Sequence, residues 1–188
     1  MAERTRGYAH RIDVRAPVEM VWRGLIEPKL LTLWYGPGAR VTPKAGGIYA
    51  VRPERDPERE AHIDVFEPGR RLRLIYMPPH GLPANEAVVV DDFILNTEKD
   101  LAVLRLMGSG FPQDETWDQY YQRQRAGWAQ ALARLKVCIE QQAKAGGKGK
   151  SPAKTPGAIL YCGWRWRRWA CGWRAGGSMG CISPIKAR

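Results

Sequence analysis

The stretch WDQYYQRQRAGWAQALARLKVCI, residues 117–139, decides the fold. Apolar and aromatic side chains recur in it at steps of three and four residues, which places them on one face of an α-helix. That stripe consists of Trp117, Tyr121, Gln124, Trp128, Leu132, Leu135 and Ile139. A helix from about Asp114 to Lys144 would be ~45 Å long at ~1.5 Å per residue. It must pack across a large surface, and the rest of the sequence predicts that this surface is a sheet.

Upstream of the helix, the pattern is that of strands interrupted by two short helices. Residues 7–15 alternate as a strand does and end at Ala16-Pro17. Pro17 suits the first turn of a helix over 18–26, and a second short helix is predicted over 29–34. Further strands are predicted at 46–52, 61–66, 71–77, 86–95 and 101–107. Strands that follow one another through short turns pair antiparallel, so we expect an α+β fold with a curved antiparallel sheet wrapped around the long C-terminal helix.

Charge divides the chain into two parts. Residues 1–144 contain all 19 acidic residues and carry a net charge of only +2, whereas residues 145–188 contain no acidic residue and carry +9. The net charge of +11 therefore belongs to the tail rather than to the folded domain that we expect at 1–144. The charged N-terminus lacks the apolar core of a signal peptide, and no run of 18 apolar residues occurs. We expect a cytoplasmic protein.

The tail has a composition unlike that of the domain. Residues 145–157 are rich in Gly, Pro and Lys, which predicts a disordered linker. The stretch GWRWRRWACGWR that follows interleaves Trp with Arg and suits weak contact with nucleic acid or with an anionic membrane. Its acid-free bias also fits an unselected extension, which is the interpretation that composition favours. Cysteines nine and ten residues apart, Cys162, Cys171 and Cys181, do not match zinc-site spacing.

Catalytic chemistry finds little support in the domain. His10, His62 and His80 share no motif, so the sequence predicts no metal, no cofactor and no catalytic group. Adjacent strand residues point to opposite faces, so either Asp91 or Asp92 should face inward, where Arg105 of the next strand could pair with it. Because charges are seldom buried, we favour a place for this pair at the rim or on the outer face.

Several motifs together resemble a known superfamily. They are IDVRAPVEMVWRGLIEPKLLTLWYGPG (12–38), Gly46-Gly47-Ile48-Tyr49, FEPGRRLRLIY (66–76), and Gly127-Trp128 followed by Leu132, Leu135 and Lys136. In this order they resemble the helix-grip (SRPBCC) superfamily, which includes START-like, birch-pollen-allergen-like and polyketide-cyclase-like domains. Within it they look most like homologues of the activator of the heat-shock protein 90 ATPase. The resemblance spans residues 8–140 and none of the tail.

This resemblance implies a cavity between the sheet and the long helix for a small hydrophobic or amphipathic ligand. The residues expected to line it are Trp34, Tyr49, Phe93, Arg105, Trp117, Tyr121 and Trp128. The alternatives are an interior that the aromatic side chains fill completely, a polyketide-cyclase-like enzyme, and a co-chaperone that acts through its surface. We favour a ligand-binding domain that is not an enzyme, and a homodimer stays open.

Overall fold

The structure, a computed structural model, describes residues 4–52, 58–76, 81–82 and 88–146. Within these residues, seven strands form one antiparallel sheet in the order β1-β7-β6-β5-β4-β3-β2. The strands are β1 (Thr5–Val14), β2 (Gly38–Val41), β3 (Ile48–Arg52), β4 (Arg59–Glu67), β5 (Arg71–Tyr76), β6 (Val90–Glu98) and β7 (Leu101–Pro112). The helices are α1 (Val18–Ile26), α2 (Pro28–Trp34) and α3 (Glu115–Gly146).

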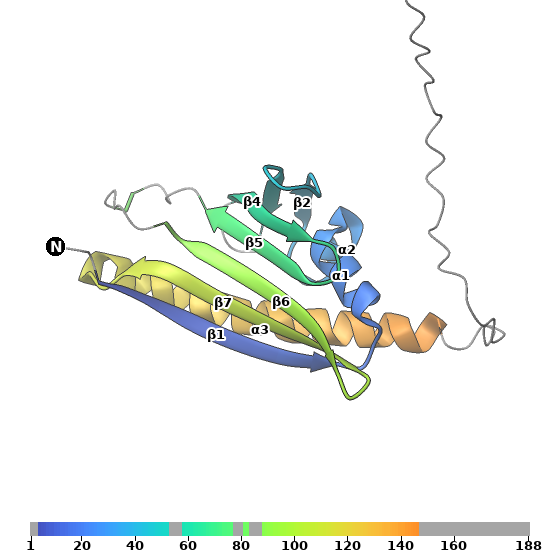
Figure 1. Ribbon diagram of the computed structural model, residues 1–188. Helices are drawn as coiled ribbons and strands as arrows, with labels where there is room; N and C mark the ends of the chain where they lie inside the picture. The colour runs from blue at the N-terminus through green and yellow to red at the C-terminus, as the bar shows by residue number, and fades with distance from the viewer. Residues whose placement is uncertain (1–3, 53–57, 77–80, 83–87, 147–188) are drawn as a thin grey trace, which may run out of the picture. The chain divides into compact units, whose positions relative to one another are not determined.

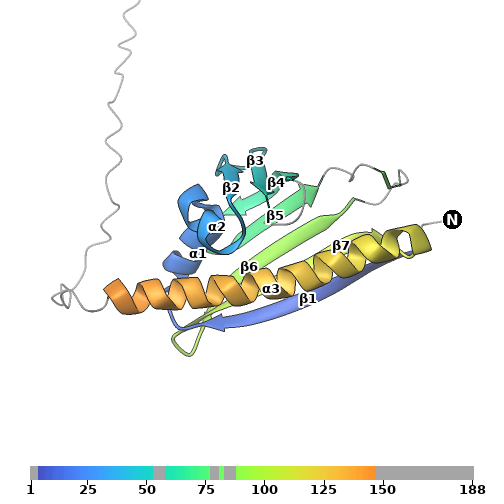
Figure 2. The ribbon, with the colours of Figure 1, turned by 180° about the vertical axis from the view of Figure 1, so that it is seen from behind.

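The long helix α3 lies along one face of this sheet (Figures 1 and 2). Seen from behind, it runs in front of β6, β7 and β1, and α1 and α2 lie beside its C-terminal half (Figure 2). The predicted α+β architecture, a curved antiparallel sheet gripping a C-terminal helix with two short helices after the first strand, is confirmed.

Alternation along the strands decides which side chains face α3. In β5 the buried residues are Leu72, Leu74 and Tyr76, and the residues between them are half-buried. β6 and β7 pair through a two-residue turn, Lys99-Asp100, in which both residues have positive φ as a type I′ hairpin requires. This tight connection fixes the register that places Asp91 opposite Gly108 on the inner face.

The stripe predicted for the long helix forms the helical side of the core. All seven of its residues are at most 9% exposed, Gln124 included. On the sheet side, the core continues through inward-facing residues such as Ile63, Leu74, Phe93 and Leu104. The aromatic stripe is therefore buried against the sheet, as its period predicts.

The bounds of several elements differ from expectation, and β6 runs over Val90–Glu98 instead of 86–95. The short edge strand β2 was not predicted, β7 continues to Pro112 instead of ending at 107, and β4 begins at Arg59 instead of 61. The tail that we expect to be disordered begins at residue 145, and residues 147–188 lie outside the described part of the chain. No helix of the described residues is long and apolar enough to cross a membrane.

Candidate functional site

A fully buried carboxylate, Asp91, lies between the sheet and α3. Strand β6 turns it inward, in phase with Phe93 and Leu95. The Tyr8 hydroxyl on β1 donates to Asp91 Oδ1 at 2.6 Å, and the indole Nε1 of Trp128 on α3 donates to Oδ2 at 2.8 Å. Each carboxylate oxygen thus has one donor, and three elements that are distant in sequence meet at one charge.

The balancing cation is Arg59, the first residue of β4. It faces inward because it is in phase with the buried residues Ala61 and Ile63 of the same strand. Its Nη2 lies 3.8 Å from Asp91 Oδ2. The guanidinium carbon lies 4.3 Å from the ring centre of Tyr76 and 5.7 Å from that of Trp128. Arg59 is therefore held mainly by aromatic faces and by charge.

The hydrogen bonds of this inward-facing cluster are incomplete. Arg59 Nη1 donates to the hydroxyl of Tyr35 at 3.1 Å. Within the described residues, Arg59 Nε, Arg59 Nη2 and the Tyr76 hydroxyl are buried and make no hydrogen bond of normal length and angle. A buried donor without a partner costs about 1–3 kcal/mol. We call Tyr8, Arg59, Tyr76, Asp91 and Trp128 the interior polar cluster.

Burial also shifts the protonation equilibria of the cluster. It raises the pKa of Asp91, while the charge of Arg59 and the nearby donors of Tyr8, Trp128 and Tyr76 act in the opposite direction. Burial and the nearby Asp91 charge raise the pKa of Tyr8, so its phenol keeps its proton and donates. The pKa of Tyr76 is raised for the same two reasons. The cluster therefore presents hydrogen-bond donors at neutral pH.

Gly108 on β7 makes room for Tyr8. A Cβ atom at this position would come within 2.2 Å of a carbon of the Tyr8 ring. Residue 108 lies directly opposite both Tyr8 and Asp91 in the sheet. The absence of a side chain there allows the Tyr8 ring to cross β7 and reach the carboxylate.

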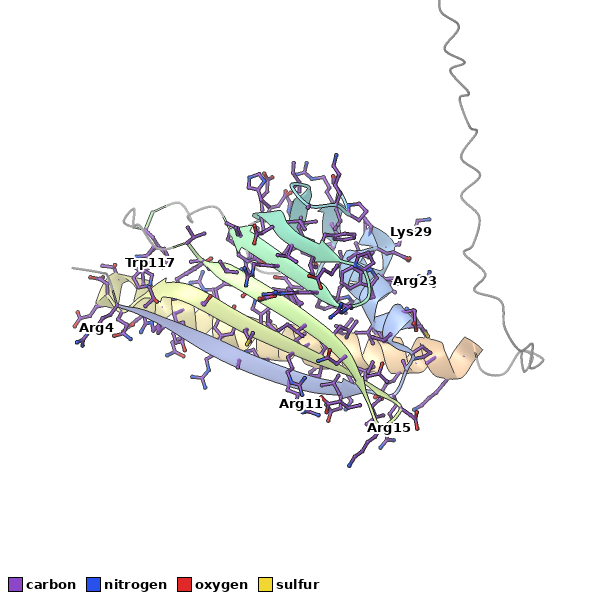
Figure 3. The ribbon with its side chains drawn as sticks, viewed as in Figure 1. Arg4, Arg11, Arg15, Arg23, Lys29 and Trp117 are labelled. Atoms are coloured by element: carbon purple, nitrogen blue, oxygen red, sulfur yellow. The ribbon has the colours of Figure 1, made fainter. Side chains whose placement is uncertain are left out.

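The predicted lining residues divide between this cluster and the surrounding core. Trp128 belongs to the cluster, and the ring of Phe93 packs edge-on against it at 5.3 Å. Trp34 and Tyr49 are buried near α1, where they donate to the carbonyls of Gly24 and Leu25, each at 3.0 Å. Tyr121 donates to the Gly7 carbonyl at 2.9 Å, and Trp117 packs edge-on against Tyr120. Figure 3 shows Trp117 at the N-terminal end of α3.

Arg105 does not join the other six. It lies between Leu104 and Leu106 on the opposite face of β7, where Nη2 contacts Glu98 Oε1 at 2.6 Å. Asp92 is likewise on the outer face and pairs with Arg71 and Arg73. The expectation that the Asp pair stays at the rim or outside is therefore wrong for Asp91, whose cation is Arg59 and not Arg105. The hydrogen bonds from Tyr8 and Trp128 and the charge of Arg59 offset the free-energy cost of burying the Asp91 carboxylate.

The seven residues expected to line the cavity did not include Tyr8, Tyr35, Arg59 and Tyr76, which are cluster or contact residues. A signal for Arg59 was present, because it continues the alternation of Ala61 and Ile63 by one more step. It was lost because the predicted strand began at 61. Tyr8 and Tyr35 had no such signal, since their contacts depend on the pairing of β1 with β7 and on where the end of α2 lies.

A separate hollow lies on the outside, between α2 and the C-terminal half of α3. Leu33 and Val137 contribute exposed apolar surface to it, beside Arg134 and Cys138. None of the seven predicted lining residues lies in this hollow. The described residues contain no group of three or more His, Cys, Asp or Glu side chains placed to hold a metal ion.

Solved structures share this fold. A protein from Mesorhizobium loti, MLL2253, is 22% identical with a TM-score of 0.64, over 72% of this chain and 98% of its own. The Aha1 dimer from Colwellia psychrerythraea is 19% identical with a TM-score of 0.62, over 72% and 96%. CalU16 from Micromonospora echinospora is 22% identical with a TM-score of 0.57, over 77% and 82%. At these identities the likeness concerns the fold.

Comparison by sequence assigns the family. A search of the curated proteins finds no match. The model of the family described as activator of Hsp90 ATPase homolog 1-like protein matches residues 15–140, from the end of β1 to the last turns of α3. That span includes four of the five residues of the interior polar cluster, and the chain belongs to this family.

Proposed function

We propose that the domain binds a small apolar or amphipathic molecule between the sheet and α3. The observation that carries this proposal is the interior polar cluster, in which three buried donor atoms make no hydrogen bond of normal length and angle inside an aromatic interior. A core that serves stability alone pairs its buried polar groups, and unpaired ones concentrate where a protein has another task. Ligand sites have this composition, apolar walls with a few polar groups.

Aromatic side chains supply the walls. Phe93, Trp128 and Tyr35 pack in sequence, with ring centres 5.3 and 5.1 Å apart. They approach the cluster from β6, from α3 and from the residue that follows α2, so a ligand there would touch both layers of the fold. The fold itself, which this chain shares with its family, supports the same place for a ligand.

The test uses an environment-sensitive apolar dye with the full-length protein. We expect saturable binding that quenches tryptophan fluorescence, and Phe93→Leu should weaken it several-fold because an aromatic wall is lost. Val137→Lys is the matched control, since it alters the outer hollow between α2 and α3 and leaves the interior intact. Weakening by Val137→Lys and not by Phe93→Leu would place the dye outside and contradict the proposal.

The cyclase-like enzyme and the surface-acting co-chaperone are the competing functions. A cyclase would convert a ligand retained from the native host, and mass spectrometry of the protein before and after incubation would show a product. A co-chaperone would bind its partner with equal strength whether or not the interior is occupied. Ligand binding without either behaviour is the expected result.

A homodimer is also proposed for this chain. The support is the solved Aha1 dimer, which has the same fold. Sedimentation equilibrium over a concentration series measures the mass directly. A monomer at every concentration would contradict a homodimer and leave the ligand proposal untouched.

A further inference from the structure

The polar atoms left over in the interior polar cluster are hydrogen-bond donors. Arg59 Nε and Nη2 can only donate, and the Tyr76 hydroxyl can donate as well. The carboxylate oxygens of Asp91 already accept from Tyr8 and from Trp128. A ligand group that completes this cluster must therefore be an acceptor.

The two nitrogens of Arg59 that make no hydrogen bond of normal geometry, Nε and Nη2, form one edge of the guanidinium, and Nη2 also faces Asp91 Oδ2 at 3.8 Å. Nη1, on another edge, is engaged with the Tyr35 hydroxyl. The N–H groups of Nε and Nη2 point the same way, so one oxygen atom can accept from both. The Tyr76 ring lies under the same guanidinium at 4.3 Å, which brings a third donor to this region.

Charge decides which kind of acceptor fits. Arg59 is positively charged and Asp91 is its counter-charge at 3.8 Å, so the pair is balanced without a ligand. A ligand carboxylate would add a second negative charge next to a fully buried one, which is unfavourable in a medium of low dielectric constant. A neutral oxygen satisfies the donors and leaves the balance unchanged.

We propose that the ligand's polar group is a neutral carbonyl oxygen, as in a ketone, ester or amide, accepting hydrogen bonds from Arg59 and Tyr76. This inference rests on the proposed ligand-binding function. The apolar remainder of the ligand would contact Phe93 and Trp128, whose rings adjoin the cluster.

The oxygen enters by a shift of the Arg59 side chain. The three free polar atoms have no exposed surface, so space for an oxygen must open beside them. Arg59 is suited to this movement because it makes a single hydrogen bond of normal geometry, to Tyr35, and its side chain is 12% exposed. Asp91, in contrast, is held at both oxygens and stays in place.

The experiment compares three molecules of equal chain length, 2-octanone, octane and octanoate, at pH 8 with the full-length protein. Each competes with the apolar dye. We expect the ketone to bind roughly tenfold more tightly than octane, the ratio given by one to two net hydrogen bonds, and more tightly than octanoate. Equal affinities for ketone and octane would mean that the donors are served by water and would overturn the proposal, as would tighter binding of octanoate.

Two variants assign the effect to named atoms. Tyr76→Phe keeps the ring and removes the hydroxyl, and Arg59→Lys keeps the charge and removes the paired N–H edge. Each should reduce the advantage of the ketone over octane several-fold. Arg105→Lys, on the outer face, is the matched control and should change nothing.

Failure of this inference is separable from failure of the proposed function. If the dye itself does not bind in the interior, the ligand-binding function is wrong. If the dye binds but the ketone has no advantage, or if its advantage survives both variants, the carbonyl assignment alone is wrong. Thermal unfolding confirms that each variant is folded, and Tyr76→Phe decides the question should Arg59→Lys not fold.

Discussion

Asp91 and Asp92 are neighbours in sequence and occupy opposite environments. Asp91 faces the interior and balances Arg59, whereas Asp92 faces outward between two arginines that stay about one-third exposed. We expect Asp91→Asn to lower the free energy of unfolding by about 3–5 kcal/mol, because it leaves Arg59 as an uncompensated buried charge. Chemical denaturation measures this difference.

The adjacent residue supplies the control for that substitution. Asp92→Asn should cost about 1 kcal/mol, since Arg71 and Arg73 remain hydrated after their partner is lost. Equal costs for the two variants would show that the charge of Asp91 is not paired as the structure indicates.

His10 on β1 gives the stability of the domain a defined pH dependence. It packs beside Tyr8, with ring centres 5.4 Å apart, and burial lowers its pKa below the usual value. The nearby Asp91 carboxylate and a hydrogen bond to the Arg125 backbone oppose this effect, and the Arg125 charge adds to it. As pH falls below about 6.5, the unfolded chain takes up a proton before the folded chain does, so stability should decrease.

Denaturation at several pH values between about 7 and 5 tests this dependence on His10. We expect His10→Gln to flatten the slope in that window. His62→Gln is the control, because His62 is exposed on β4 and should leave the slope unchanged. A slope that persists in His10→Gln would assign the pH dependence to another group.

Sequence alone could identify that an Asp faces inward, but not which cation accompanies it. Alternation within one strand predicts that one of the two neighbours faces inward, but it did not single out Asp91, and the expectation favoured the rim or the outer face. The contact with Arg59 joins β6 to β4 across β5, so it depends on the strand order and on where β4 begins. Local patterns do not contain that information.

At the scale of elements, α3 is docked on the sheet through Trp128. This side chain is 1% exposed, packs on Phe93 and donates to Asp91. Trp128→Ala should lower the free energy of unfolding by about 3–5 kcal/mol, as deletion of a buried aromatic does. Chemical denaturation decides this, and a loss below roughly 1 kcal/mol would mean that α3 is not docked through this face.

Trp128→Phe separates the packing of the indole from its hydrogen bond. The smaller ring keeps most of the apolar contact and removes the Nε1 donor from a buried carboxylate. We expect an intermediate loss of about 1–3 kcal/mol, the cost of an unsatisfied buried acceptor. A variant as stable as the wild type would show that the hydrogen bond contributes nothing.

Elements with a strong period were predictable, whereas the four-residue strand β2 was not. The stripe on α3 and the alternation of LRLIY in β5 each repeat several times, so a few irregular residues did not obscure them. β2 has four residues and follows Gly36-Pro37, which removes any periodic signal. It forms because β3 offers it an edge, and this is a tertiary cause.

At the scale of the whole molecule, the core formed by the described residues lies ahead of the tail in the sequence. Its buried members lie between Tyr8 and Ile139, and α3 ends at Gly146. The net positive charge, in contrast to the core, lies mostly in the tail, since residues 145–188 carry +9 of the total +11. Stability and charge should therefore respond separately when the tail is removed.

Truncation after Lys144 tests this separation. The melting temperature should stay within a few degrees of that of the full chain, because no described core residue is lost with the tail. Affinity for DNA or for anionic vesicles should disappear, since the remaining +2 is too small to attract them, and in the full chain it should fall steeply with salt. Melting scans and a salt series on both proteins measure the two responses. A large loss of stability on truncation would show that the tail tryptophans belong to the core. Anion binding that survives truncation would instead be assigned to arginines of the domain, such as Arg11 on β1 and Arg4 and Arg15 just beyond its two ends (Figure 3).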